Sequence, residues 1–458
     1  MVLYVNVPIS TEVIESNPDC KISGHYENGA LVITVDTRAQ NHHQRLGLPT
    51  KTKLYWYREH QYEVQELSAM AWPVKYRVLS RDGYYLDKEG RRVNFTTQAQ
   101  GLDARRGVSE VLMRAAVLLV VVAGIGYRRV AWLLEHLFHV QTSKSALHRW
   151  VEEVASELPS VEAIIKKLNE RQPIREAHFD EVYPRGGDKC VVALKDEHGR
   201  IVVTHEMDRR DGESINNFFT WVKGLGLEIQ AFYIDGCKTY YNAIRAVYGE
   251  AVAIQYDYFH IVQNVWRHLW RWAVKHRRDV KNRSEEVETP WYKAKLKTLA
   301  TSLWENRYLL FKAETRMSPE EKDELLRIIE ADCKVGCLRT FLGGVWRIFE
   351  DSHDALEARQ ALSELKQQPI DKKNPKPFRQ VIDFLAQNFV WMTEYLRQPN
   401  VRRNSLAESG MRTLRRLEAS HDGFRSKQGR ENCLRIYQVV KYLGWSVYRS
   451  PQQCLKTL

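Results

Sequence analysis

The sequence predicts a multidomain protein of the α+β / α/β class, in which a mixed sheet core is interrupted by a large all-helical insertion. Three observations predict this fold. Residues 175–268 alternate strand and helix patterns, residues 270–400 are nearly all helical by periodicity, and the first hundred residues are typical of strands joined by tight turns. With 458 residues, 44% of them hydrophobic and 28% charged, the chain is long enough for two to four domains with buried cores.

Five regions are therefore expected along the chain. They are a β-rich N-terminal domain at 1–105, a unit of short helices at 106–172, the first part of the sheet core at 173–268, the helical insertion at 269–400, and the C-terminal helices of the core at 401–458.

Hairpin turns are indicated in the N-terminal domain by glycine after a polar or acidic residue. Asn28-Gly29 precedes an apolar strand at residues 31–35, and Asp82-Gly83 and Glu89-Gly90 follow the aromatic, β-branched segment 53–64. Glycine supplies the positive φ angles that such turns require. The pattern predicts strands but does not indicate what the domain binds.

Three short helices are predicted in the second region, where the first ends at Gly124-Ile-Gly126 and Thr142 is the expected N-cap of the third. Lys144, His148 and Arg149 lie off the apolar stripe of the third helix. These features are typical of a DNA-binding helix-turn-helix, although any small three-helix packing unit would share them. The apolar positions recur at i, i+3, i+4 and i+7 on core-facing stripes, namely Val130, Leu133, Leu134 and Leu137 and then Leu147, Trp150, Val151 and Val154.

In the third region, three adjacent strand patterns are followed by helix, strand, helix, strand and helix, which is the order of an RNase H-like core. Asp180 lies within the first predicted strand, and Asp235 ends the fourth and is followed by Gly236. The first and fourth strands are neighbours in such a sheet, so the two carboxylates would meet. Paired anionic oxygens repel unless divalent cations lie between them, and Mg²⁺ prefers such ligands. Asp235 could instead merely begin a turn.

Two further sets of residues are candidates with strong structural alternatives. Glu408 is a late carboxylate, but Ser405 and Glu408 also have the spacing of a capping box, in which the glutamate returns to the N-cap amide. Asp257 and His260 are three apart at a strand-to-helix junction, where an Asp is also an ordinary N-cap.

Positive charge favours a polyanionic partner, because 69 Lys and Arg against 57 Asp and Glu give a net charge of +12. Arg271, Lys275, Arg277 and Arg278 follow tryptophans in the predicted helix after residue 258, a mixture that suits contact with DNA phosphates. The alternative is a helix whose tryptophans face the core and whose cations are solvated.

Several function classes are excluded or disfavoured. The chain has no G-x-x-x-x-G-K-[ST], G-x-G-x-x-G, H-E-x-x-H or G-x-S-x-G motif, which disfavours nucleotide hydrolysis of the P-loop kind. The longest apolar run is too short to cross a membrane, the N-terminus lacks a secretion signal, and the seven cysteines are dispersed. We therefore expect a cytoplasmic protein with reduced thiols, associated with the nucleoid when it is bound to DNA.

The ordered motifs resemble those of bacterial insertion-sequence transposases of the DDE class, and the most similar group is the ISL-three-like one. The matching stretches are His178-Phe-Asp180-Glu-Val, Tyr233-Ile-Asp235-Gly-Cys-Lys-Thr-Tyr, Asp257-Tyr-Phe-His260-Ile-Val-Gln-Asn264, and Asn404-Ser-Leu-Ala-Glu408 followed by Gly423-Phe-Arg-Ser426. They span residues 178–426, with the helix-turn-helix upstream. The pair Asp257 and His260 matches a C/D-x-x-H motif of several such transposases.

The resemblance implies that Asp180, Asp235 and Glu408 are the catalytic acids and bind two Mg²⁺ ions, with Mn²⁺ as a substitute. It implies DNA cleavage at transposon ends and strand transfer by a two-metal mechanism. The implied partners are double-stranded DNA, as terminal inverted repeats and target, and further copies of the chain in a homodimer or higher oligomer, with no membrane and no nucleotide.

One departure and two alternatives accompany this expectation. Relatives often carry an N-terminal zinc finger, whereas Cys20 is the only cysteine before residue 190. The alternatives are a transposase-derived DNA-binding protein without catalysis, which intact acids disfavour, and a stand-alone RNase H-like nuclease.

Overall fold

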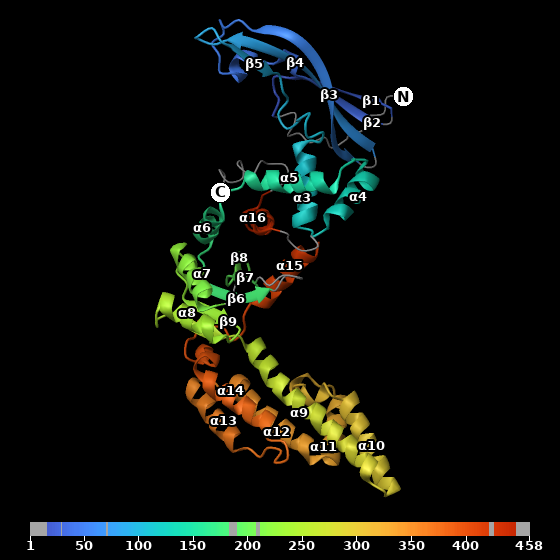
Figure 1. The fold of residues 1–458 in the computed structure, drawn as a ribbon, viewed down its shortest axis with the longest axis vertical. Helices are drawn as coiled ribbons and strands as arrows, with labels where there is room; N and C mark the ends of the chain where they lie inside the picture. Colours follow the sequence, from blue (N-terminus) through green and yellow to red (C-terminus); the bar gives the residue numbers. More distant parts are fainter. Residues whose placement is uncertain are drawn as a thin grey trace.

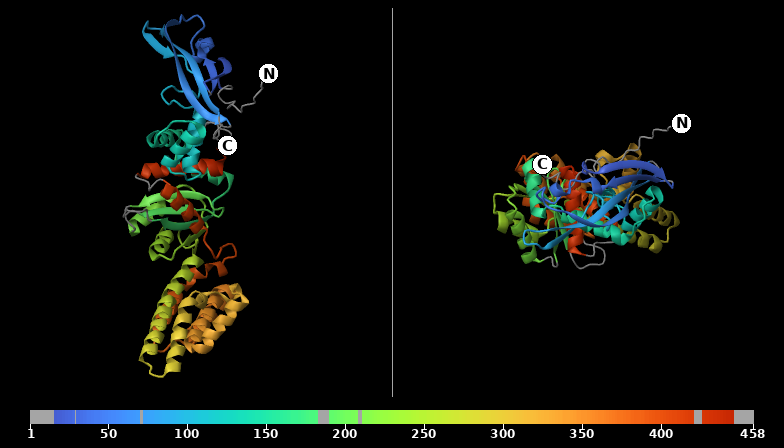
Figure 2. Two further views of the ribbon diagram at one scale, coloured as in Figure 1. Left: turned by 90° about the vertical axis from the view of Figure 1, so that its right-hand side faces the viewer. Right: turned by 90° about the horizontal axis from the view of Figure 1, so that it is seen from above.

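The protein is described by a computed structural model that covers residues 16–28, 30–69, 72–182, 190–207, 211–420 and 426–445, with only the backbone described at 67–69, 72, 182, 407–411, 419 and 420. The molecule is elongated, with a β-sheet at one end, a second sheet at its middle and a helical body at the other end (Figures 1 and 2). In the part of the chain described, no helix has the length and apolar character needed to span a bilayer.

The N-terminal sheet is mixed, with β2 and β4 parallel and its other pairs antiparallel. Its strands lie in the order β1-β2-β4-β3, and β5 pairs with β4. Val35, Val64, Tyr76 and Val78 form its small core. The elements are β1 (Lys21–Glu27), β2 (Ala30–Asp36), the 3₁₀ turn η1 (Thr37–Ala39), α2 (His42–Arg45), β3 (Tyr55–Ala69), β4 (Trp72–Leu86) and β5 (Arg92–Thr96).

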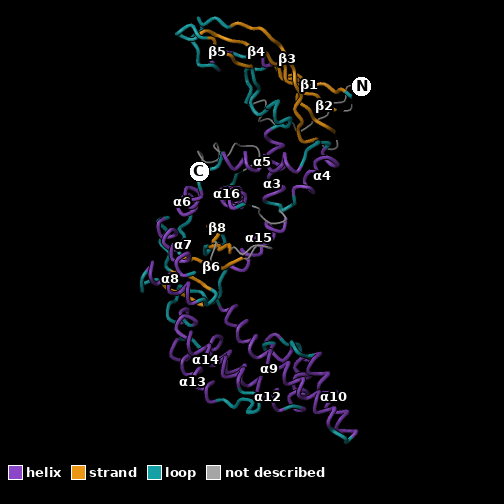
Figure 3. The backbone as a smooth tube through the Cα atoms, in the orientation of Figure 1, coloured by secondary structure: helices purple, strands orange, loops and turns teal. Residues whose placement is uncertain are grey.

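Four helices follow the sheet, and the last helix of the described residues packs among them (Figure 3). The N-cap of the third helix is Ser143, whose side chain accepts the Ala146 N–H, so the expected N-cap at Thr142 is wrong by one residue. Leu137 is 56% exposed, so it is not part of a core-facing stripe as expected. The helices are α3 (Glu110–Val121), α4 (Tyr127–Phe138), α5 (Lys144–Ser156), α6 (Val161–Arg171) and α16 (Lys427–Leu443).

The central sheet is also mixed and has the strand order β10-β9-β6-β7-β8. β6, β7 and β8 are antiparallel neighbours, whereas β6, β9 and β10 are parallel. The first and fourth strands of this region, β6 and β9, are therefore adjacent, as predicted. The strands are β6 (Glu176–Val182), β7 (Cys190–Lys195), β8 (Ile201–Met207), β9 (Ala231–Ile234) and β10 (Ala253–Tyr256).

Different helices cover the two faces of the central sheet. α7 (Gly212–Gly224) and α8 (Lys238–Tyr248) cover one face, where Phe179 of β6 packs on Phe218, Phe219 and Tyr240. α15 (Ala407–Ser420) and α16 lie on the opposite face and bury Ala193 and Ile201 with their leucines. Because side chains alternate along a strand, Asp180 faces α15 and not the side of Phe179.

A body made mainly of helices connects β10 to α15 and shares one continuous apolar core with the sheet (Figure 1). Ser318 and Glu321 form the predicted capping box, with Pro319 as the first helical residue. The elements are α9 (Tyr258–Glu286), α10 (Pro290–Glu305), η2 (Leu309–Phe311), η3 (Glu314–Arg316), α11 (Pro319–Ala331), α12 (Cys333–Trp346), the π-helical turn η4 (Arg347–Asp351), α13 (Ala355–Gln367), α14 (Lys376–Met392) and η5 (Glu394–Leu396).

The two ends of this helical body lie side by side. The Tyr258 N–H, at the start of α9, donates to the Arg403 carbonyl at 3.4 Å, and the Arg403 guanidinium lies 4.4 Å from the centre of the Tyr258 ring. The chain therefore returns to its starting point before α15 begins.

Candidate active site

Asp180 lies in β6, and Asp235 directly follows β9, the parallel neighbour of β6. The register pairs Glu176 with Ala231 and His178 with Tyr233. The His178 and Tyr233 rings stack with their centres 4.2 Å apart, so both lie on the face covered by α15. Asp180 and Asp235 each follow this last pair by two residues, and the negative charge of Asp235 acts on the Asp180 carboxyl, so the two groups lie near each other. The predicted meeting of these carboxylates therefore agrees with the strand pairing.

The electrostatic environment of Asp180 reflects this proximity. Burial raises the pKa of its half-buried carboxyl, and the negative charge of Asp235 raises it further. The Glu181 N–H, which donates to Asp180 Oδ1 at 2.8 Å, acts in the opposite direction. The positive charges of His260 and Arg415 also oppose the rise, which identifies a histidine and an arginine near this carboxyl.

Asp235 takes part in a tight turn as well. Its Oδ1 accepts the Cys237 N–H at 3.0 Å, as the turn interpretation of the sequence expects. Gly236 has φ +86°, and a Cβ there would lie 1.8 Å from a ring atom of Tyr256. Only glycine permits this turn with the Tyr256 ring packed against the backbone, and the turn fixes the Asp235 carboxylate at the end of β9.

The two residues that directly precede α15, Ser405 and Leu406, are hydrogen-bonded by three buried side chains. Two of these side chains come from strands of the sheet, and the third comes from the residue after β10. The Ser405 N–H donates to Asp257 Oδ1 at 3.2 Å, and the Leu406 N–H donates to His178 Nδ1 at 3.1 Å. Lys195 Nζ donates to the Leu406 carbonyl at 2.9 Å. We call His178, Lys195 and Asp257 the α15 clamp.

Sequence reasoning did not identify His178 or Lys195 as site residues. His178 is fully buried, and because its Nδ1 accepts the Leu406 N–H, the ring proton lies on Nε2, 3.3 Å from Glu176 Oε2. Burial lowers the pKa of Lys195, and the negative charge of the nearby Asp196 raises this pKa in part. The only available signal was polar residues at buried positions of predicted strands, which require partners.

Asp257 and His260 are accounted for in different ways. Asp257 is the N-cap of α9 and accepts the Phe259 N–H at 3.2 Å, so the structural alternative is correct for it. Burial raises the pKa of the Asp257 carboxyl, whereas the Ser405 N–H and His260 act against that rise. His260 thus lies close enough to affect both Asp180 and Asp257.

The position of Glu408 is described only for its backbone. It lies in the first turn of α15, directly after the clamped residues. Its side chain is outside the described residues, so its role as a metal ligand or as a capping residue stays a prediction. The described side chains include no group of three His, Cys, Asp or Glu placed to hold a metal ion.

Comparison with known families matches the region that contains these residues. A family model described as transposase, for the ISL3 group with the DDE signature, matches residues 178–429, more than half of the chain. The chain belongs to this transposase family. A comparison with curated proteins gave no match. Membership identifies an insertion-sequence transposase whose substrate is DNA, in a class that generally uses divalent metal ions.

The basic residues of this transposase that are predicted to contact DNA lie on two helices, α5 and α9. On α5, Lys144, His148 and Arg149 are all exposed, and His148 Nδ1 lies 3.6 Å from Glu152 Oε2. On α9, Trp272 is buried in the core, as the structural alternative expects, while Trp266 and Trp270 are half-buried. These surfaces contain the residues predicted to contact DNA.

The four cations predicted on α9 are not equivalent. Arg271, Lys275 and Arg278 are exposed and form no ion pair with any described residue. Arg277 is half-buried, donates to the Ala300 carbonyl at 3.3 Å and lies 4.7 Å from the centre of the Trp304 ring. Arg277 therefore joins α9 to α10, and we no longer group it with the three solvated cations.

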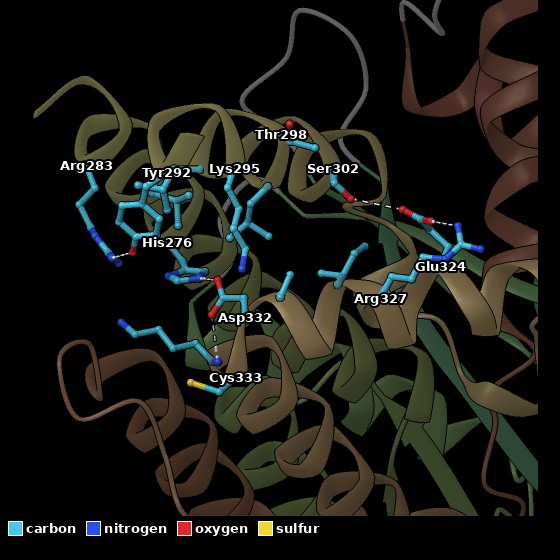
Figure 4. Close-up of a pocket in the computed structure, with 16 residues that line it drawn as sticks. His276, Arg283, Tyr292, Lys295, Thr298, Ser302, Glu324, Arg327, Asp332 and Cys333 are labelled. Carbon is cyan, nitrogen blue, oxygen red and sulfur yellow. Dashed lines mark hydrogen bonds and ion pairs between the residues drawn. The ribbon is translucent and has the colours of Figure 1, made fainter. Parts of the chain in front are cut away.

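A cavity of about 650 Å³ lies in the helical body between α9, α10, α11 and α12 (Figure 4). His276 Nε2 lies 2.5 Å from Asp332 Oδ2 at its wall, and Lys334 Nζ lies 3.2 Å from Asp371 Oδ2. Its lining includes neither Asp180 nor Asp235. The His276–Asp332 pair joins α9 to the start of α12, and the Lys334–Asp371 pair joins α12 to the segment before α14. Both pairs therefore serve the packing of the helical body.

Proposed function

We propose that this transposase cleaves DNA at the ends of its insertion sequence and transfers the freed strand to target DNA, using Asp180, Asp235 and Glu408 as catalytic acids. The observation that carries the proposal is the parallel pairing of β6 with β9, together with the influence of the Asp235 charge on the Asp180 carboxyl. The strand order of the central sheet supports an RNase H-like core with the helical body as its insertion.

The third acid is supported by helix geometry. Arg415, on α15, lies near enough to Asp180 to lower the pKa of that carboxyl. Residue 408 is seven positions earlier on α15, and residues seven apart share nearly the same helical face. The α15 clamp fixes the backbone immediately before this position.

The residues present fit divalent metal ions. Asp180 and Asp235 are two half-buried carboxylates close together, and the pKa of Asp180 is raised mainly by burial and further by the charge of Asp235. Asp180, Asp235 and Glu408 would hold two Mg²⁺, or Mn²⁺, which when bound supply Lewis-acid stabilisation of the attacking and leaving oxygens. His260 and Arg415 add positive charge beside Asp180, where they can orient a DNA phosphate.

The remaining parts of the proposal concern DNA and assembly. The exposed cations of α5 support binding of terminal inverted repeats by a helix-turn-helix, and those of α9 support contacts with flanking DNA phosphates. We further propose action in the cytoplasm on nucleoid DNA, by a homodimer or higher oligomer, without a nucleotide cofactor.

The decisive experiment measures Mg²⁺-dependent cleavage of duplex DNA that carries one end of the insertion sequence. Asp180→Ala, Asp235→Ala and Glu408→Gln should each lower the cleavage rate by at least about 10³-fold, since each removes a group that acts on the transition state. DNA affinity should stay near that of the wild type.

Glu408→Gln separates the two interpretations of this residue. Glutamine can still complete a capping box but cannot replace an anionic metal ligand. Cleavage by Glu408→Gln at the wild-type rate would therefore contradict the catalytic assignment. A strand-transfer assay with the same ends tests the alternatives: cleavage without transfer identifies a nuclease, and binding without cleavage identifies a DNA-binding protein.

A further inference from the structure

The free end of the N-terminal sheet carries an exposed cluster of tyrosines and cations. It is formed where β5 joins the adjoining ends of β3 and β4, at the end of the molecule opposite the helical body (Figure 1). We call it the tyrosine–arginine face; its residues are Lys53, Tyr55, Tyr57, Arg58, Tyr84 and Arg92.

A β-bulge brings these side chains to one side of the sheet. The register of β3 and β4 pairs Tyr55 with Tyr84 and Arg58 with Asp82, and it shifts between Trp56 and Arg58. Tyr57 is the additional residue, 54% exposed, and its ring centre lies 6.4 Å from that of Tyr84. A bulge re-aims side chains in this way, so Tyr57 lies beside Tyr84 where simple alternation would separate them.

The rings of this face are already stacked. The Tyr55 and Tyr84 rings are 4.9 Å apart and nearly parallel, and Lys53 Nζ lies 5.1 Å from the centre of the Tyr55 ring. The Arg92 guanidinium lies 4.1 Å from the centre of the Tyr84 ring, and its Nε donates to Asn94. These contacts hold Lys53 and Arg92 in place before any partner binds, which lowers the entropy cost of binding.

The charges on the two sides of the sheet differ. Lys53, Arg58 and Arg92 form no ion pair among the described residues, and the nearby acid Asp82 accepts a hydrogen bond from Thr96. On the opposite side, the cations pair with carboxylates. Arg38 pairs with Asp36, Lys75 with Glu63, and Arg77 with Glu27 and Glu63.

We propose that the tyrosine–arginine face binds the phosphate backbone of double-stranded DNA. Unpaired, pre-ordered cations complement a polyanion, and guanidinium donors suit phosphate oxygens. The Tyr55 and Tyr84 rings stack on each other and also contact Lys53 and Arg92. Because their ring faces already have partners, contacts with the DNA backbone are favoured over stacking with single-stranded bases. The proposal deepens the proposed function by giving the N-terminal sheet a share of its DNA substrate, separate from α5 and α9.

The test uses the full-length protein and Mg²⁺-free buffer, so that binding is measured whether or not the predicted acids catalyse cleavage. Fluorescence anisotropy records affinity for insertion-end duplex DNA across a salt series. The variant Lys53→Gln/Arg58→Gln/Arg92→Gln should bind roughly tenfold more weakly at physiological salt, with a salt slope smaller by about 2–3, at roughly 0.9 per lost phosphate contact. The charge-matched control is Arg38→Gln/Lys75→Gln/Arg77→Gln on the opposite side.

The control variant should keep the wild-type salt slope if circular dichroism shows that it is folded. An unchanged affinity and slope in the first variant, or an equal loss in the control, would overturn the proposal. The proposal would also be overturned if the triple substitution weakened binding to single-stranded DNA of the same length more than binding to duplex DNA. A change of oligomeric state in sedimentation with unchanged DNA binding would overturn it as well, and would identify the face as a contact between protein chains.

Discussion

The α15 clamp concentrates polar contacts at two consecutive residues. His178 accepts the N–H of Leu406, and Lys195 donates to the carbonyl of the same residue. Asp257 accepts the N–H of Ser405. Buried polar groups are costly unless they are bonded, so each partner holds the other in place. The start of α15 is therefore fixed in position relative to β6, which contains Asp180, and to β7, which pairs with β6.

The substitution Lys195→Met tests whether the α15 clamp fixes the start of α15. Methionine keeps the apolar stem but removes the hydrogen bond from Lys195 Nζ to the Leu406 carbonyl, so we expect a loss of about 1–3 kcal/mol in unfolding free energy. Cleavage should slow while DNA affinity is kept, and amide exchange should rise at residues 405–411.

The matched control is Lys223→Met, which removes a similar bond from Lys223 Nζ to the Val247 carbonyl on the other side of the sheet. Equal effects of both substitutions on cleavage would show that the clamp acts only through general stability.

What could be predicted at this scale depended on local patterns. The adjacency of β6, which contains Asp180, and β9, which precedes Asp235, followed from the order of strands and helices. The N-cap role of Asp257 followed from its place before α9. The partners of His178 and Lys195 lie more than 200 residues away in the sequence. No spacing rule covers such a pair, because only the folded sheet brings its members together.

At the scale of single elements, α9 combines a structural and a solvated side. Arg277 packs over Trp304 and bonds to α10, whereas Arg271, Lys275 and Arg278 extend into solvent. Such an assignment needed the position of α10, since the sequence shows only that the four cations are close together.

We expect the variant Arg271→Gln/Lys275→Gln/Arg278→Gln to bind DNA more weakly, with a salt slope smaller by about 2–3 at roughly 0.9 per phosphate. Arg277→Gln alone should instead lower the melting temperature and leave the slope unchanged. The measurements are a salt titration and calorimetry of both proteins. A lower slope for Arg277→Gln would return this residue to the DNA-binding group.

Periodicity was reliable for α5 and less so for α4. All four apolar positions predicted on α5 are buried, but on α4 only Val130 and Leu134 are fully buried. α4 lies at the outside of the helical group, so only a narrow stripe of it meets a neighbour. Hydrophobic spacing gives the face of a helix that can be buried, and the packing of its neighbours decides how much of that face is covered.

At the scale of the whole molecule, α16 connects regions that are distant in sequence. Its Ile436, Val439 and Leu443 complete the core of α3, α4, α5 and α6, while Leu434 packs with Ile201 of β8. Gln438 donates to the Ile201 and Val202 carbonyls at 2.8 and 2.7 Å. Sequence reasoning assigned this helix to the sheet core alone, because periodicity does not reveal that both of its sides are covered.

We therefore expect the group of α3 to α6 and the central sheet to unfold together in one calorimetric transition. Ile436→Ala and Leu434→Ala alter opposite sides of α16, and each should lower that shared melting temperature, at a cost of about 2–5 kcal/mol for a buried aliphatic side chain. The control Leu356→Ala, at a position 75% exposed, should have little effect. Separate transitions that respond to only one substitution each would contradict this coupling.

The side-by-side ends of the helical body have a consequence for how this protein family can diversify. Asp257 Oδ1 accepts N–H groups from both Phe259 and Ser405, and Tyr258 contacts Arg403. The helical body is also joined to the sheet through α14, where Trp391 packs on Tyr241 and Tyr256. Insertions or deletions can therefore accumulate in the loops of this body that lie away from α14, whereas a change that displaces α14 would also displace β10 and the start of α15. New target choices can evolve in those distant loops while the cleavage chemistry is inherited intact.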